Sequence, residues 1–148
     1  LGCALADASI EWSAWQAFQG GAMLWRRDTE GITIYYEDGT WTELPDEWDQ
    51  ESAIPSRGSP PPGKFHPQRG FGYAWGSRDE LFERLAWALE REKGFCAKIQ
   101  QFDLGVILQS STVETCLADL FNWATHPDFN HVFLSIYNDG TYSDLFDE

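Results

Sequence analysis

The sequence predicts a mainly β fold with short helices (α+β), built from two pseudo-symmetric units of antiparallel β-hairpins. Three observations predict this class: a series of motifs that occurs twice, Asp-Gly turn signals between strand-like segments in both copies, and two stretches whose apolar residues follow helical spacing. The chain has 148 residues, of which 43% are hydrophobic, so it is long and apolar enough to bury a core.

The repeat is found when residues 1–25 are aligned with residues 85–109 at a constant offset of 84. Seven of these 25 positions are identical, namely Leu1/Leu85, Ala4/Ala88, Leu5/Leu89, Gln16/Gln100, Phe18/Phe102, Gly21/Gly105 and Leu24/Leu108. A second block aligns residues 34–41 with residues 135–142 at an offset of 101, so the second copy holds 17 extra residues. Because both blocks occur in the same order, we interpret the chain as a duplicated unit.

The duplication divides the chain into three segments. Residues 1–49 form the first β unit, and residues 64–148 form the second unit, with a leading helix and an inserted helix. Residues 50–63 between them are rich in proline and glycine and include three consecutive prolines, which favour an extended backbone. We expect an ordered connector that crosses the surface, rather than a proline-rich ligand peptide or a disordered linker.

Tight-turn signals separate the strand-like segments. The Asp-Gly pair is a strong hairpin signal, and it occurs as Asp38-Gly39 between residues 32–36 and 40–42, and as Asp139-Gly140 between residues 133–137 and 141–143. The flanking segments are rich in Ile, Tyr, Trp and Thr, which suit a half-buried pleated surface. Both copies are therefore expected to contain antiparallel hairpins.

Two helices are expected to interrupt the β pattern. The first spans residues 79–93, where apolar residues recur at helical spacing behind Ser77 as an N-cap. The second spans residues 112–125 within the insertion, behind a capping box formed by Ser111 and Glu114. We expect the apolar face of each helix to pack on the core.

The charge balance excludes one class of partner. The chain carries 10 Lys and Arg against 24 Asp and Glu, a formal net charge of −14. Such a chain repels a phosphate backbone, so we expect no nucleic-acid partner. No apolar run approaches the roughly 20 residues of a membrane-spanning helix, so we expect a soluble protein without membrane insertion.

The cysteines and the start of the chain leave several interpretations open. The three cysteines, Cys3, Cys96 and Cys116, match no zinc spacing, and the sequence fits either one disulfide with one free thiol or three buried thiols. The chain begins at Leu1 inside a repeat motif and shows no targeting peptide. We interpret it as a processed or excised piece of something longer.

Three motifs carry a resemblance to a known family. Leu1-Gly2-Cys3-Ala4-Leu5, Gln16-x-Phe18-x-x-Gly21-x-Met23-x-Trp25 and Ile34-Tyr35-Tyr36-Glu37-Asp38-Gly39-Thr40-Trp41 resemble the LGxA, QxFxxGxMxW and DGTW motifs of tandem repeat modules in secreted bacterial proteins, for example of Chloroflexi. Arg69-Gly70-Phe71-Gly72 with Trp75 looks like the stretch between such repeats, and the modules are loosely similar to the LGFP repeats of cell-wall-associated proteins. The resemblance implies an extracellular or cell-surface binding module. The second copy departs from it, with Gln109 in place of Trp25 and Tyr142 in place of Trp41.

No catalytic motif is found in the sequence. The clusters Glu43/Asp46/Glu47/Asp49 and Asp144/Asp147/Glu148 are interpreted as solvated surface, because nothing fixes a pair of carboxylates across a substrate. The Asp-Gly turns lack the alternating carboxylates of a calcium loop, and a metal site at His126, Asp128 and His131 is the weaker interpretation of that loop. We therefore expect no enzyme, no cofactor and no metal.

The aromatic residues are the feature with functional potential. Eight tryptophans exceed what a core of this size usually needs, and exposed aromatic faces bind sugar rings. The candidate ligand-binding residues are Trp25, Tyr36, Trp41, Trp48 and Tyr142. We expect a non-enzymatic module that binds cell-envelope glycan or a protein partner. The alternatives are a self-associating structural subunit and, less favoured, a hydrolase that uses two carboxylates.

Overall fold

The computed structural model describes residues 1–111 and 133–144. The described strands form one antiparallel sheet in the order β4-β3-β2-β1-β5-β6-β7-β8. Their bounds are β1 Ser9–Phe18, β2 Gly21–Arg26, β3 Gly31–Tyr36, β4 Trp41–Pro45, β5 Lys93–Phe102, β6 Gly105–Ser111, β7 Phe133–Tyr137 and β8 Tyr142–Asp144. The class predicted from the sequence, mainly β with short helices, is confirmed.

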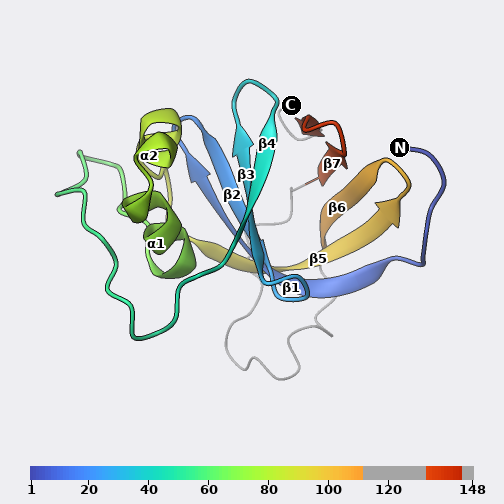
Figure 1. Ribbon diagram of the computed structural model, residues 1–148, viewed down its shortest axis with the longest axis horizontal. Helices are drawn as coiled ribbons and strands as arrows, with labels where there is room; N and C mark the ends of the chain where they lie inside the picture. The colour runs from blue at the N-terminus through green and yellow to red at the C-terminus, as the bar shows by residue number, and fades with distance from the viewer. Residues whose placement is uncertain (112–132, 145–148) are drawn as a thin grey trace.

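The sheet curls until it is nearly barrel-shaped (Figure 1). Its two outer hairpins meet at their turns, where Trp41 N–H donates to the Gly140 carbonyl at 2.8 Å and Tyr142 N–H donates to the Gly39 carbonyl at 3.0 Å. This contact brings the turn before β4 against the turn before β8. The first and the last hairpin therefore lie side by side although they are far apart in the sequence.

The two halves of the sheet follow the same register. In β1–β2, Ser13 pairs with Arg26, and in β5–β6, Ala97 pairs with Ser110, which is the same pair shifted by 84 residues. At the centre, β1 pairs with β5 so that Trp12 faces its own equivalent, Cys96. A local twofold axis therefore passes through this central pair and relates β1–β4 to β5–β8.

Two helices cover one face of the first half of the sheet (Figure 1). They are α1, Arg69–Ser77, and α2, Asp79–Leu85. Their buried side chains pack with those of the strands in one core, whose members are Ala14, Phe18, Met23, Ile32, Ile34, Tyr36, Phe71, Ala74, Trp75, Leu81, Leu85 and Ala88. A second core, around Phe95, Leu108 and Tyr35, fills the inside of the curled sheet.

The helix predicted over residues 79–93 ends at Leu85, shorter than expected. Ala86 adopts φ 56° and ψ −130°, which stops the helix, and Ala88 then forms β-bridges with Phe18 and Phe65. The apolar residues after Leu85 therefore belong to an extended segment and not to a helix. Helix α1 was not predicted, because its glycines obscure a helical pattern. The helix predicted over residues 112–125 lies outside the described residues.

The connector of residues 50–63 contains no helix or strand and lies over the helices. Arg57 holds it there: its backbone N–H donates to His66 Nε2 at 3.2 Å, its guanidinium donates to Asp79 at 2.9 Å, and it lies 4.8 Å from the ring centre of Phe82. Both units predicted from the sequence contribute strands to the same sheet. Neither described helix is long and apolar enough to cross a membrane.

Two of the cysteines lie in the described part of the chain. Cys96 on β5 is buried and disulfide-bonded. Cys3 is exposed and carries a free thiol. Cys116 lies outside the described residues. Of the two interpretations that the sequence allowed, the structure contains a disulfide with a free thiol at Cys3.

Candidate binding site

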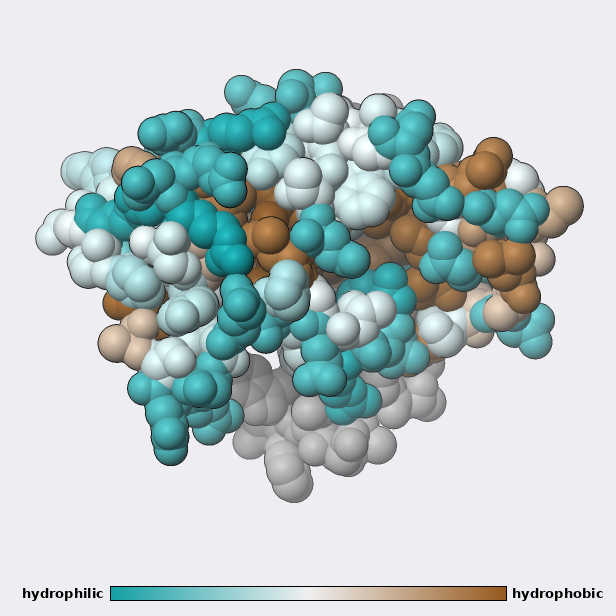
Figure 2. Space-filling view, viewed as in Figure 1, coloured by the Kyte–Doolittle hydropathy of each residue, from teal (hydrophilic) through white to brown (hydrophobic). Residues whose placement is uncertain are grey.

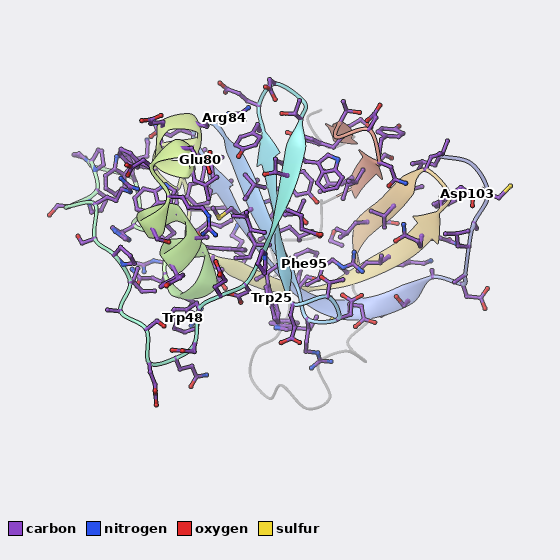
Figure 3. The ribbon with its side chains drawn as sticks, viewed as in Figure 1. Trp25, Trp48, Glu80, Arg84, Phe95 and Asp103 are labelled. Carbon is purple, nitrogen blue, oxygen red and sulfur yellow. The ribbon has the colours of Figure 1, made fainter. Side chains whose placement is uncertain are left out.

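A cavity of about 270 Å³ lies between the first half of the sheet and the start of α1. We call it the tryptophan cavity, because three indole side chains line it together with three charged side chains and several small or apolar residues. The lining residues are Trp12, Ala14, Trp25, Ile32, Asp46, Trp48, Arg69, Gly70, Phe71, Glu92 and Gly94. Figure 3 shows Trp48 below the helices and Trp25 toward the lower ends of the strands.

The floor of the cavity is a row of residues that pair across neighbouring strands. Gly94 on β5 pairs with Ala14 on β1, Ala14 pairs with Trp25 on β2, and Trp25 pairs with Ile32 on β3. Residues paired in this way project from the same face of a sheet. The small residues at one end of the row leave space beside the Trp25 indole.

The Trp12 ring closes one side of this floor. A Cβ atom at position 94 would lie 2.4 Å from the ring of Trp12, so only glycine lets the indole lie across β5 at this point. Trp12 itself is half-buried. Gly94 therefore determines how closely one wall of the cavity approaches the sheet.

The opposite wall comes from the segment after β4. Asp46 Oδ1 accepts a hydrogen bond from the Trp48 backbone N–H at 3.2 Å, and the Trp48 indole N–H donates to the Ser52 carbonyl at 3.1 Å. A carboxylate that binds the N–H two residues on is a common local turn. It fixes the half-buried Trp48 ring at the edge of the cavity.

The charged groups of the cavity are unevenly balanced. Arg69 lies 3.6 Å from the mostly buried Glu92 carboxylate, whereas Asp46 has no ion pair within residues 1–111 and 133–144. Burial raises the pKa of Glu92, opposed by Arg69 and reinforced by Asp46. Burial also raises the pKa of Asp46, with the Trp48 N–H opposing and Glu30 reinforcing the shift. Both carboxylates are thus in surroundings that disfavour their negative charge.

Two residues that line the cavity carry a strained backbone or an unsatisfied buried atom. Arg69 has φ 51°, a conformation that costs a non-glycine residue about 1 kcal/mol or more. The Trp25 indole N–H is shielded from solvent and has no hydrogen-bond partner among the described residues, which costs roughly 1–3 kcal/mol. Backbone strain of the kind found at Arg69 is typical of ligand sites.

The lining residues define the chemistry that the cavity can perform. Three indoles offer apolar faces, two carboxylates accept hydrogen bonds, and the Arg69 guanidinium donates them. Among the described residues, the lining contains no Ser, Cys, His or Lys side chain. No group of three or more His, Cys, Asp or Glu in the described residues is placed to hold a metal ion. The arrangement suits binding of a small polar molecule that has an apolar face.

The structure separates the candidate residues named from the sequence into two places. Trp25 and Trp48 line the tryptophan cavity. Trp41 and Tyr142 lie instead where the two outer hairpins meet: the Trp41 indole donates to the Tyr137 carbonyl at 2.9 Å, and the Tyr142 hydroxyl donates to the Tyr36 carbonyl at 2.8 Å. They join the hairpins and belong to the framework.

Tyr36 is also placed away from the cavity. Its ring is 5% exposed within the helix-side core, and the Arg84 guanidinium covers it at 3.4 Å from the ring centre. Arg84 also forms an ion pair with Asp38 at 3.0 Å. Figure 3 shows Arg84 near the turn between β3 and β4. Tyr36 is therefore covered by the protein itself.

Sequence reasoning missed the charged part of the cavity. Asp46 was interpreted as solvated, but it is half-buried beside α1, where a Cβ atom on Gly70 would lie 2.6 Å from its Oδ1. Glu92 and Trp12 gave no local signal, because the fold brings them in from the residue before β5 and from β1. The available signal was Arg69-Gly70, a positively charged residue followed by a glycine that admits Asp46.

No family model matches this chain, and no curated protein and no solved structure matches it.

Proposed function

We propose that the protein is a non-enzymatic carbohydrate-binding module that holds a sugar ring in the tryptophan cavity. The observation that carries the proposal is the grouping of three indoles with two carboxylates and an arginine around about 270 Å³ of space. This volume is close to the lower end of small-ligand sites, which span roughly 300–1,000 Å³. The cavity is thus matched to one or two rings.

The chemistry of a sugar fits these walls. One face of a pyranose ring consists of C–H groups and packs on an indole, while hydroxyls around its rim donate and accept hydrogen bonds. The carboxylates of Asp46 and Glu92 can accept from such hydroxyls. A hydroxyl or ring oxygen can accept from the Arg69 guanidinium, which also lines the cavity. One ligand class therefore uses both the apolar and the polar groups.

The carboxylates support binding rather than hydrolysis. Glycoside hydrolysis needs one carboxyl that stays protonated and another that stays ionised, so their pKa values are pushed apart. Burial is the main cause of the pKa shift of both Asp46 and Glu92, and it raises both pKa values. A hydrolase is therefore the less favoured function for this pair.

The proposal includes an extracellular or cell-surface location, with cell-envelope glycan as the ligand. The disulfide at Cys96 supports this location, because disulfides persist in oxidising compartments. The resemblance to secreted repeat modules points the same way.

Calorimetric titration with soluble cell-envelope oligosaccharides tests the proposal. We expect wild-type protein to bind, and Trp25→Ala and Trp48→Ala to weaken binding at least about tenfold, since each removes a stacking surface. Trp41→Phe is the matched control, because Trp41 lies outside the cavity, and it should bind as wild type does. Circular dichroism verifies that each variant is folded. Absence of binding by the wild type, or equal loss in Trp41→Phe, would contradict the proposal.

A second function is favoured by a separate observation. Leu5 and Leu104 are 61% and 59% exposed at the end of the sheet near the N-terminus, where apolar side chains gather in Figure 2. Apolar residues at such a place can join copies of the chain. Sedimentation velocity tests this self-association: Leu104→Asp should convert a dimer to monomer, and a monomeric wild type would eliminate it.

A further inference from the structure

We propose that the sugar selected by the tryptophan cavity is an amino sugar whose amine is unacetylated and positively charged. This inference rests on the proposed function, since it names the class of sugar that the same cavity binds. It follows from the balance of charge, from the three indoles and from the Arg69 guanidinium beside them.

The charge balance of the cavity favours a cation. Asp46 and Glu92 line it against a single cation, Arg69, which lies 3.6 Å from Glu92. The Asp46 carboxylate has no ion pair among the described residues, and Glu30 adds further negative potential to it. A ligand amine beside Asp46 would supply the missing positive charge. A sugar acid would instead be repelled by both carboxylates and by a protein of net charge −14.

The aromatic walls favour the same charge. Indole is the aromatic side chain that attracts a cation most strongly over its face. Trp12, Trp25 and Trp48 line the cavity together with both carboxylates. An ammonium group on a ring stacked there meets both an indole and a carboxylate. An acetylated amine loses the charge and both attractions.

The guanidinium in the cavity distinguishes an amino sugar from a simple ammonium ion. Arg69 lines the cavity beside the carboxylates and the indoles, and a guanidinium donates hydrogen bonds to oxygen. Choline-like ions present methyl groups to aromatic walls and carry a single hydroxyl. An amino sugar carries the amine and several oxygens on one ring. It is therefore the ligand class that uses the carboxylates, the guanidinium and the indoles together.

Three oligosaccharides of equal length and linkage test the inference. They are β-1,4-linked and differ at C2: glucosamine with an amine, glucose with a hydroxyl, and N-acetylglucosamine with an acetamide. Titration calorimetry at pH 6, where an amine is protonated, should show the glucosamine oligomer binding at least about tenfold more tightly than the glucose oligomer. The acetamide should remove the advantage.

A charge-matched pair of variants shows whether the cavity is responsible. The double variant Asp46→Asn/Glu92→Gln should lose the preference for the amine. The double variant Glu80→Gln/Glu83→Gln removes the same number of charges from exposed positions on α2 and should retain it. Figure 3 shows Glu80 on α2, apart from Trp25 and Trp48. If the first variant does not fold, Asp46→Asn alone serves, with Glu80→Gln as its control.

The outcomes separate this inference from the proposed function. Equal binding of the amine and hydroxyl oligomers, or tighter binding of the acetamide, overturns the inference and leaves sugar binding intact. Loss of the preference in the α2 variant shows attraction by the whole protein and also overturns it. Failure of all three oligomers overturns the proposed function as tested by these sugars. Choline that binds as tightly as the glucosamine oligomer shows that the ring is not recognised and overturns both.

Discussion

The half of the sheet formed by β1–β4 and the half formed by β5–β8 share one hydrogen-bonded framework. The Gln16 amide donates to the Glu90 carbonyl at 2.8 Å, and its equivalent Gln100 donates to the Ala6 carbonyl at 2.9 Å. Asp38 Oδ1 accepts from the Thr40 hydroxyl at 2.6 Å, as Asp139 Oδ1 accepts from Thr141. The residues that occur in both copies therefore fix turns and strand ends.

The tryptophan cavity belongs to the first half. In the second half, Gln109 stands at the position equivalent to Trp25, and Cys96 stands at the position equivalent to Trp12. In the first half, Ile10 stands at the position equivalent to Gly94. The second half therefore lacks both indoles, and the space that Gly94 leaves for the Trp12 ring has no counterpart beside Ile10. The comparison teaches that the duplicated residues specify the backbone, whereas the residues that the copies do not share specify the candidate site.

The largest effect is expected when a turn residue of the second half is placed in the first. Gly20 corresponds to Leu104, and a Cβ atom at position 20 would lie 1.9 Å from the Arg84 carbonyl oxygen at the end of α2. Gly20→Leu should therefore displace α2 and lower the free energy of unfolding by more than about 4 kcal/mol. Chemical denaturation measures this loss.

The reciprocal exchange is the control for this variant. Leu104 is 59% exposed, so Leu104→Gly should cost no more than about 1 kcal/mol, mainly through the entropy of glycine. Similar losses for both exchanges would show that α2 does not depend on the absence of a side chain at position 20. The comparison between the halves would then lose its steric basis.

The next effect concerns binding. Gly94→Ile places in β5 the residue that β1 has at position 10, and its Cβ atom would fall 2.4 Å from the Trp12 ring. The indole must move into the cavity, so sugar affinity should fall at least about tenfold, with a loss of stability of about 1–3 kcal/mol. Calorimetry and thermal unfolding measure the two. Ile10→Gly should leave the sugar affinity unchanged. A loss of affinity in this variant would show that sugar binding does not depend on the shape of the tryptophan cavity.

A smaller and symmetrical effect is expected where the outer hairpins meet. Trp41→Phe removes the bond to the Tyr137 carbonyl, and Tyr142→Phe removes the bond to the Tyr36 carbonyl. Each should lower the free energy of unfolding by about 1 kcal/mol and leave sugar affinity as in the wild type. Urea unfolding compares the two. A change in affinity in either variant would place these residues in the binding site after all.

The sequence predicted the framework well because framework signals are local. Asp-Gly turns and alternating apolar residues determine hairpins within a few residues, and the offset of 84 between copies matches the pairing of Trp12 with Cys96. Helix α1 was missed because its glycines are required by close contacts with other segments: a Cβ atom on Gly76 would lie 2.5 Å from the carbonyl oxygen of Pro55 in the connector, and one on Gly72 would lie 2.4 Å from the Pro67 carbonyl oxygen. Such contacts exist only after folding.

The candidate site was predicted only in part, for the same reason. Trp25 and Trp48 were identified from residue type alone, and the structure brings them together. Residue type also identified Trp41 as a candidate, but its indole N–H donates a hydrogen bond to the Tyr137 carbonyl and lies outside the cavity. Asp46 and Glu92 are more than forty residues apart in the sequence, and only the fold brings their charges close enough to interact. No spacing in the sequence predicts that they share a site.

The smallest expected effect is a dependence on pH that has opposite signs for affinity and stability. Burial raises the pKa of Asp46 and of Glu92, so acidification protonates them above the ordinary carboxyl range. An amino sugar, whose amine is protonated at pH 6 and below, then loses its anionic partners, and its affinity should fall about two- to fivefold from pH 6 to pH 4. Asp46→Asn/Glu92→Gln should flatten this dependence.

Stability should change in the other direction. A carboxyl whose pKa is raised on folding binds its proton more tightly in the folded state, so its contribution to stability is greatest in acid and is lost as the pH rises through the folded-state pKa. Asp49 contrasts with this pair, because the Ser52 hydroxyl lowers its pKa and its contribution is lost as the pH falls. Relative to the wild type, the double variant should therefore gain melting temperature at pH 7 and not at pH 4. A variant less stable than the wild type at pH 7 would show that the two carboxylates stabilise the fold, and that their burial is not a cost retained for a ligand.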